Sequence, residues 1–264
     1  MGIERICLQE AIHLAKRGKK YWVNVGLMYL AGLKNPLQSR VFRAAYFFCR
    51  HIDDVLDGDR EISGDPEDYV HSIMEGMNGK KGAPRIVNLY DFVMERIENN
   101  GTDNPIKDFR ELIEVMLFDY TRSKERRVLT KQELEDYFAR TFIPALNIAL
   151  QIGESKMRGC DLPEMILIMG HLYSIRDMQV DLSRGIINIP YEELELSGLN
   201  GSFSYQDVRK NGHLSIWMDC EVKEYGRILN DCRDKLNREG DLGSRRICFP
   251  KIWAMERYCK KYFL

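Results

Sequence analysis

Hydrophobic residues recur at three- and four-residue spacing along most of the chain. One stripe reads Ile106, Phe109, Leu112, Ile113, Met116, Leu117 and Tyr120. This spacing places apolar side chains on one face of an α-helix, so we interpret the stripe as the core-facing side of a helix. Helices are predicted in the same way over residues 3–18, 36–58, 65–76, 84–99, 131–152, 161–185, 214–238 and 249–262.

Capping and breaking residues support several of these boundaries. Thr130 and Glu133 have the pattern of a capping box, and Pro144 should kink the helix that follows. The polar, turn-rich segment 197–212 is predicted to be a loop. Four basic residues precede the capping box: Arg122, Lys124, Arg126 and Arg127. We interpret them as solvated loop charge, with assistance to phosphate binding as the alternative.

The helix over 36–58 ends in FFCRHIDDVLDGD, where apolar residues give way to aspartates. Asp53 and Asp57 lie one turn apart on one face. Arg50 lies one turn earlier, and Asp54 is adjacent. Carboxylates this close repel one another unless a cation lies among them, and Mg²⁺ commonly binds one or two carboxylates together with substrate phosphates. The motif is therefore a candidate Mg²⁺ site, although an acidic pair on a helix is more often a solvated face.

A second acidic pair occurs in SIRDMQVDLSRG. Asp177 and Asp181 are again four residues apart. Arg176 precedes them directly, and Arg184 follows one turn later. An apolar run, LPEMILIMGHLY, leads into this pair as well. Two arginine-flanked pairs, each closing an apolar helix, favour a shared function over coincidence.

The composition is that of a globular protein. A length of 264 residues with 44% hydrophobic and 30% charged residues suits one domain spanning residues 1–264. The net charge of −1 provides no global field for a polyanion, so no nucleic-acid partner is expected. Seven scattered cysteines without a CxxC pair argue against a disulfide framework and a structural zinc site, and they fit a reducing cytoplasm.

No apolar stretch approaches the roughly 20 residues that span a bilayer. The N-terminal sequence carries distributed charges and no small-residue cleavage site, so no signal peptide is predicted. The expected location is cytoplasmic, and the terminal CKKYFL leaves a peripheral membrane contact open. The sequence does not indicate an oligomeric state.

The two motifs resemble those of a known family. CRHIDDVLDG, followed downstream by RDMQVDLSRGIINIP, resembles the squalene/phytoene synthase family of class I isoprenoid synthases, over about residues 36–194. The resemblance implies an all-α, single-domain helical bundle with a central apolar cavity and two aspartate motifs facing one another at its mouth. It also implies Mg²⁺-assisted loss of diphosphate from an allylic prenyl diphosphate.

Individual residues are assigned roles on the same hypothesis. The predicted metal ligands are Asp53, Asp54, Asp57, Asp177 and Asp181, of which Asp54 is a supporting ligand and the other four are also catalytic. The predicted substrate contacts are Arg50, Tyr46, Arg176, Arg184 and Tyr173, and the predicted catalytic tyrosine is Tyr137. For each arginine, a salt bridge to the neighbouring aspartate is the alternative, and both roles can coexist.

The chain departs from the family pattern around the second motif. Family members carry a Val-Ala-Gly run and a second tyrosine after the position of Tyr137, where this chain continues with Phe138. Polar family positions are occupied here by Gly170, Tyr173 and Val180. Because groups around a metal site tune it, the surroundings of the second aspartate pair are expected to be less polar than in the family.

Three functions remain open at this point. The commonest reaction of the family is head-to-head condensation of two prenyl diphosphates, such as farnesyl or geranylgeranyl diphosphate, to squalene, dehydrosqualene or phytoene. The alternative enzyme is a class I terpene cyclase or prenyltransferase that uses one prenyl diphosphate. A non-catalytic binding protein is the third hypothesis, and retention of both aspartate pairs argues against it. NADPH use stays open, because reducing members of the family also lack a glycine-rich dinucleotide fingerprint.

Overall fold

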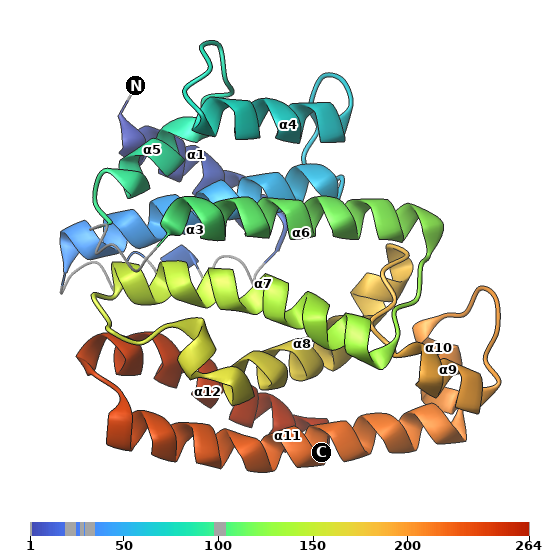
Figure 1. Ribbon diagram of the computed structural model, residues 1–264. Helices are drawn as coiled ribbons and strands as arrows, with labels where there is room; N and C mark the ends of the chain where they lie inside the picture. The colour runs from blue at the N-terminus through green and yellow to red at the C-terminus, as the bar shows by residue number, and fades with distance from the viewer. Residues whose placement is uncertain (1, 19–24, 27–28, 30–34, 98–103, 264) are drawn as a thin grey trace. The chain divides into compact units, whose positions relative to one another are not determined.

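The computed structural model describes residues 2–18, 25–26, 29, 35–97 and 104–263 (Figure 1). Within these residues the secondary structure is helical without a strand, and one isolated bridge pairs Val128 with Ile187. The predicted all-α fold class is confirmed. No helix in these ranges is both long enough and apolar enough to cross a bilayer.

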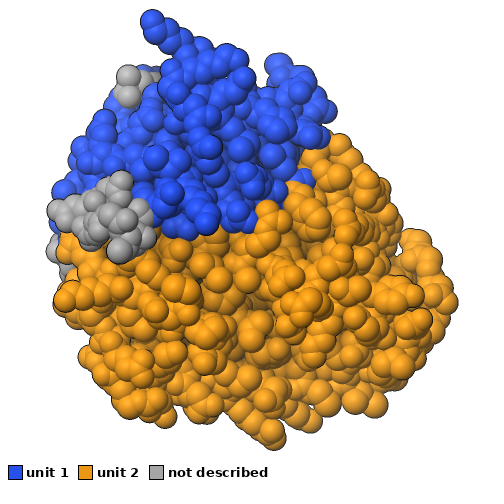
Figure 2. Space-filling view, viewed as in Figure 1, with its two compact units in different colours: residues 1–117 blue, residues 118–264 orange. Residues whose placement is uncertain are grey.

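The chain divides into two compact units, residues 1–117 and 118–264, which have different colours in Figure 2. The boundary falls inside the helix α6 (Pro105–Glu125). Each unit buries its own set of apolar side chains. The single-domain organisation expected for residues 1–264 stays a prediction.

Unit 1 is built around α3 (Pro36–Leu56), whose apolar face is buried. This helix packs against α1 (Ile3–Lys16), α4 (Pro66–Met77) and α5 (Val87–Met94). The rings of Phe48, Tyr90 and Phe109 meet with centroids 5.4 to 5.6 Å apart, in the range of favourable aromatic pairs. This packing fixes the orientation of the helix that carries the first acidic motif.

Unit 2 is organised around α8 (Pro163–Ser183). The other helices of this unit are α7 (Lys131–Ile152), a short 3₁₀ turn (Gly159–Asp161), α9 (Tyr191–Ser197), α10 (Tyr205–Lys210), α11 (Gly212–Glu239) and α12 (Leu242–Tyr262). α8 packs mainly against α7 and α11, and also contacts α10 and α12 (Figure 1). Met165, Ile168 and Leu172 are fully buried, because neighbours cover α8 on several sides.

The capping box predicted before α7 is confirmed. Glu133 N donates to Thr130 Oγ1 at 3.2 Å, and Thr130 N donates back to the Glu133 carboxylate at 2.8 Å. Two boundary predictions were wrong. Residues 205–210 form α10 instead of a loop, because Ser204 and Asp207 make a second capping box. The last helix starts before residue 249, because Asp241 caps it.

Candidate functional site

The first acidic motif lies at the C-terminal end of α3. The last turn closes where Asp57 N donates to the Asp53 carbonyl oxygen at 2.9 Å. Gly58 then adopts φ 73°, a left-handed conformation that glycine reaches without strain. Asp53 and Asp57 are both partly exposed. Since the C-terminus of a helix carries partial negative charge, two carboxylates at this position favour a bound cation.

Asp54 differs from its neighbours because its side chain is only 1% exposed. Arg50 joins the motif internally, with Nη1 2.5 Å from Asp53 Oδ2 and Nη2 2.5 Å from Asp54 Oδ1. Arg17, which follows α1, donates to Asp54 and also pairs with Asp59. A buried carboxylate held by two guanidinium groups is compensated in charge and in hydrogen bonding. Asp54 therefore joins α3 to the end of α1, and its role as a supporting metal ligand stays a prediction.

A second polar cluster extends the contact among α1, α3 and α4. Arg60 Nη2 donates to Glu10 Oε2 at 2.5 Å. His51 lies 3.3 Å from the same carboxylate oxygen and 3.0 Å from the Tyr69 hydroxyl. Burial, together with the positive charge of Arg60, lowers the pKa of His13. The surroundings of the first motif are thus a network of paired charges.

The second acidic motif lies in the last turns of α8. Arg176 forms a two-pronged pair with Asp177, in which Nε donates to Oδ1 at 2.9 Å and Nη2 donates to Oδ2. The same guanidinium lies over the Tyr173 ring, 4.2 Å from its centroid. Arg176 therefore forms the salt bridge to its neighbouring aspartate that the sequence offered as the alternative to phosphate binding. The roles of Arg176 and Tyr173 as substrate contacts stay predictions.

Asp181 has a different environment from the other aspartates. Its carboxylate accepts a hydrogen bond from the neutral amide of Asn188, with Nδ2 3.2 Å from Oδ2. Burial, followed by the negative charges of Asp177 and Asp119, raises the pKa of Asp181 to about 7. A cation beside this carboxylate would offset the burial and the two negative charges, and so would lower the pKa of Asp181. Asp181 is therefore the strongest electrostatic indication of a cation position in unit 2.

A chain of hydrogen bonds behind Asp181 was not predicted from the sequence. Tyr137 OH donates to Asp119 Oδ2 at 2.6 Å. Arg122 then donates from Nε to Asp119 Oδ1 and from Nη2 to Asn188 Oδ1, both at 2.6 Å. Burial raises the pKa of Asp119, and burial with the Asp119 charge raises that of Tyr137 well above its ordinary value. Tyr137 therefore remains a protonated hydrogen-bond donor.

The interpretation of the basic segment as solvated loop charge was wrong for Arg122. Its side chain is 1% exposed, and its guanidinium lies 4.5 Å from the centroid of the Tyr137 ring. A signal for this arrangement exists in the sequence. Asp119 and Arg122 are three residues apart, a spacing at which helical side chains meet, and Asn188 interrupts the apolar run IINIP.

A cavity of about 200 Å³ opens beside the second motif. Its aromatic lining residues are Tyr137, Phe138, Phe142 and Tyr173, and its polar ones include Asp177, Asp181 and Asn188. Aromatic faces stabilise cations, and the carboxylates supply oxygen ligands on the same wall. The volume is below the roughly 300–1,000 Å³ of typical small-molecule sites, so this cavity is too small to enclose a long prenyl chain completely.

Gly170 and Phe138 together account for two of the departures from the family pattern. A Cβ atom at residue 170 would lie 2.3 Å from the Phe138 ring. The ring therefore packs directly on the backbone of α8, and it also meets His171 with centroids 5.1 Å apart. The bulkier aromatic residue on α7 requires the glycine on α8.

Tyr46 and Arg184 are the remaining predicted substrate contacts, and their positions do not test that role. Tyr46 is half-buried on α3, with its ring edge-on to Phe47 at 5.6 Å. Arg184 follows the last residue of α8, and its backbone N donates to the Asp181 carbonyl oxygen at 3.0 Å. The structure brings together Arg50, Asp53 and Asp54 in unit 1, and Tyr137, Tyr173, Arg176, Asp177 and Asp181 in unit 2. The expected apposition of the two motifs concerns both units and stays a prediction.

The second motif fits a divalent cation that prefers oxygen. Asp177 and Asp181 line one cavity, and their mutual repulsion contributes to the raised pKa of Asp181. In the part of the chain that the structure describes, no three His, Cys, Asp or Glu side chains converge on a metal position. Mg²⁺ commonly binds one or two carboxylates and completes its coordination with water and phosphate oxygens. Two carboxylates therefore suit Mg²⁺ better than zinc, which needs a closed set of ligands in structural sites. Arg176, which pairs with both oxygens of Asp177, would have to release at least one of them for a metal to bind there.

Comparison with known proteins gives one match. A family model described as squalene/phytoene synthase matches residues 29–260. Neither the curated proteins nor the solved structures include a significant match to this chain.

Proposed function

Because the chain belongs to the squalene/phytoene synthase family, we propose that it ionises an allylic prenyl diphosphate with Mg²⁺ and joins two such molecules head to head. Farnesyl and geranylgeranyl diphosphate are the candidate substrates. A hydrocarbon of the squalene or phytoene type is the candidate product. The family match spans both acidic motifs, which supply the carboxylates that this chemistry needs.

The observation that carries this proposal is the position of Asp177 and Asp181 on the wall of an aromatic cavity. Ionisation of an allylic diphosphate creates an anion that leaves and a carbocation that stays. Carboxylates can hold a metal against the anion, while the rings of Phe142 and Tyr173, which line the same cavity, would stabilise the carbocation and exclude water from it. One wall of unit 2 therefore serves both products of the ionisation.

Each residue around this wall has a defined task in the proposal. Bound Mg²⁺ would neutralise the negative charge that develops on the diphosphate. Asp177 and Asp181 would hold the metal, and Asn188 would keep the second carboxylate oriented through the bond it receives from Arg122. Tyr137 would contribute its ring and a fixed hydroxyl donor, because its high pKa keeps it from acting as a base.

Incubation of the purified protein with farnesyl or geranylgeranyl diphosphate and Mg²⁺, in parallel with and without NADPH, tests the proposal. A squalene-type product needs a hydride donor, whereas a phytoene-type product forms by proton loss alone. We expect a C30 or C40 hydrocarbon by mass spectrometry, with release of inorganic diphosphate that EDTA abolishes. Asp177→Asn should remove both signals. Asp231→Asn, on the exposed face of α11, is the matched control and should retain them.

The small cavity of unit 2 favours a second candidate, in which one prenyl diphosphate is ionised and then cyclised or transferred to another acceptor. A C15 or C20 product, or a prenylated acceptor, would replace the condensation with this reaction. Absence of diphosphate release together with absence of Mg²⁺-dependent ligand binding would contradict both enzymes and favour a binding role.

A further inference from the structure

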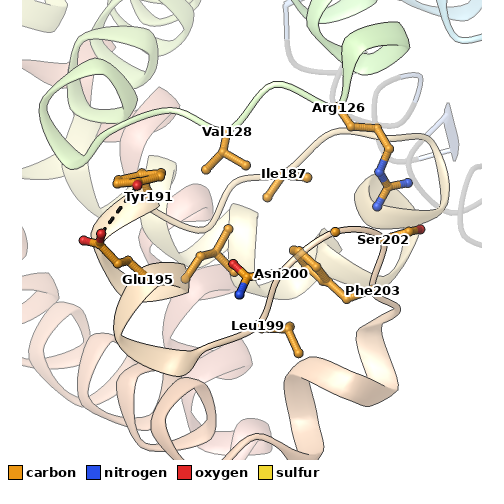
Figure 3. Close-up of a pocket in the computed structure, with 11 residues that line it drawn as sticks. Arg126, Val128, Ile187, Tyr191, Glu195, Leu199, Asn200, Ser202 and Phe203 are labelled. Carbon is orange, nitrogen blue, oxygen red and sulfur yellow. Dashed lines mark hydrogen bonds between the residues drawn. The ribbon is translucent and has the colours of Figure 1, made fainter.

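A second cavity in unit 2, of about 490 Å³, has no part in the proposed reaction. Figure 3 shows it between the segment that follows α6 and the residues that follow α9. Its volume lies within the roughly 300–1,000 Å³ of small-molecule sites. Val128, Ile187, Leu194 and Phe203 give it an apolar lining.

Arg126 is the basic residue of this cavity. Its Nη2 nitrogen is buried and makes no hydrogen bond to any residue that the structure describes. A buried guanidinium nitrogen without an acceptor loses its hydration and gains nothing in return, which is an unfavourable arrangement that an anion would relieve. The residue also adopts φ 51°, a conformation that is uncommon and strained for a residue other than glycine.

The walls of the cavity are tied together before any ligand binds. Tyr191 N donates to the Leu129 carbonyl oxygen at 2.8 Å, and Lys131 N donates to Glu192 Oε2 at 2.9 Å. These bonds add to the bridge between residues 128 and 187. A cavity that is already formed binds a ligand without the cost of ordering its walls.

Charge is distributed unevenly along the cavity. Figure 3 shows Arg126 and Glu195 at opposite ends, with apolar side chains and the Asn200 amide between them. Glu195 is near Tyr191, whose hydroxyl lies 3.5 Å from Oε1. An anionic group is therefore attracted to one end and repelled from the other. The arrangement selects a molecule with one anionic head and an apolar body, and it rejects a molecule with an anion at each end.

We infer that this cavity, which we call the Arg126 pocket, binds a compact amphiphile whose phosphate or carboxylate head pairs with Arg126. The apolar body lies against Val128, Ile187 and Phe203. The pocket is separate from the cavity of the second motif, with which it shares no lining residue. Ile187 lines one and the next residue, Asn188, lines the other, so the segment between α8 and α9 is the wall between them.

Isothermal titration of the full-length protein with octyl phosphate and with octanoate, in buffer containing EDTA, tests this inference. Both probes lack a diphosphate, and the metal is removed, so the result does not depend on the proposed reaction. We expect saturable binding of one molecule per chain by at least one probe. Octyl phosphate as the tighter ligand would assign phosphate monoesters, and octanoate would assign fatty acids. Suberate, an eight-carbon diacid, should bind at least about tenfold more weakly than octanoate.

Matched variants locate the binding site. Arg126→Gln should weaken binding by about tenfold or more, the loss expected for one charge-assisted hydrogen bond. Arg127→Gln is the control, because that neighbouring side chain pairs with Glu133 outside the pocket and its loss should change affinity less than twofold. Leu199→Trp fills the pocket without changing charge and should also weaken binding. No saturable binding, equal effects of the two arginine variants, or full affinity in both Arg126→Gln and Leu199→Trp would overturn the inference.

Discussion

The two acidic motifs share a four-residue spacing but differ in how their charge is balanced. In the first motif, Arg50 and Arg17 supply cations directly to the carboxylates, and Asp54 is buried among them. In the second motif, the carboxylate of Asp181 meets a neutral amide and has a pKa raised to about 7. The second motif also carries a cation, because Arg176 pairs with Asp177, but Asp181 is left with the neutral amide and is the carboxylate that would benefit from an added cation.

The largest expected effect concerns catalysis and requires both motifs. On the proposed function, Asp53→Asn and Asp177→Asn should each lower turnover of a prenyl diphosphate by about 1,000-fold or more, because each would remove a ligand for the metal that is proposed to neutralise the leaving group. Diphosphate release measures turnover, and far-ultraviolet circular dichroism checks the fold. If the first motif is purely structural, Asp53→Asn will retain turnover while Asp177→Asn loses it.

The next largest effect is a loss of stability, which we expect when the buried aspartate of the first motif is replaced. Asp54→Ala should destabilise the protein by about 1–3 kcal/mol, because Arg17 and Arg50 lose the buried carboxylate they share and keep only Asp59 and Asp53 as partners. Urea unfolding at pH 7 measures the change. Arg17→Met/Asp54→Leu is the comparison variant. It removes both partners of one contact, and a smaller loss than in Asp54→Ala would identify the unpaired charge as the cause. Equal losses would attribute the effect to packing instead.

In the second motif, replacement of an aspartate should stabilise the protein instead of destabilising it. A carboxyl whose folded-state pKa is raised to about 7 contributes stability while it is protonated and loses that contribution as pH rises through about 7. The cost of ionising the buried carboxyl accumulates as pH rises from the unfolded-state pKa near 4 to the folded-state pKa of about 7. Asp181→Asn removes this cost, so in EDTA the variant should be more stable than the parent by about 1–3 kcal/mol at pH 8, with little difference at about pH 4. Thermal unfolding at both pH values measures this. A variant that is less stable at pH 8 would show that Asp181 is already compensated in the folded protein.

The sequence predicted that both motifs exist, but it did not predict the distant side chains that make their surroundings different. Helical periodicity, the capping box at Thr130 and the two acidic pairs depend on residues close together in the chain, so pattern reasoning found them. The link from Arg122 to Asn188 joins residues 66 positions apart, and no local pattern states which distant side chain an arginine will meet. The packing of Phe138 on Gly170 was unpredictable for the same reason. The sequence showed two unusual residues, and only the fold showed that they compensate each other.

The smallest expected effect tests that compensation on the wall of the second cavity. Gly170→Ala adds a Cβ atom 2.3 Å from the Phe138 ring, which should cost about 1–3 kcal/mol through overpacking. Replacing glycine with alanine inside a helix returns about 1 kcal/mol, so we expect a net loss of about 1 kcal/mol. Phe138→Leu shortens the clashing side chain. The double variant Gly170→Ala/Phe138→Leu should therefore be more stable than the sum of the single changes predicts. Urea unfolding of the four proteins measures this interaction energy, and an additive result would show that α7 and α8 accommodate the methyl group without the contact seen here.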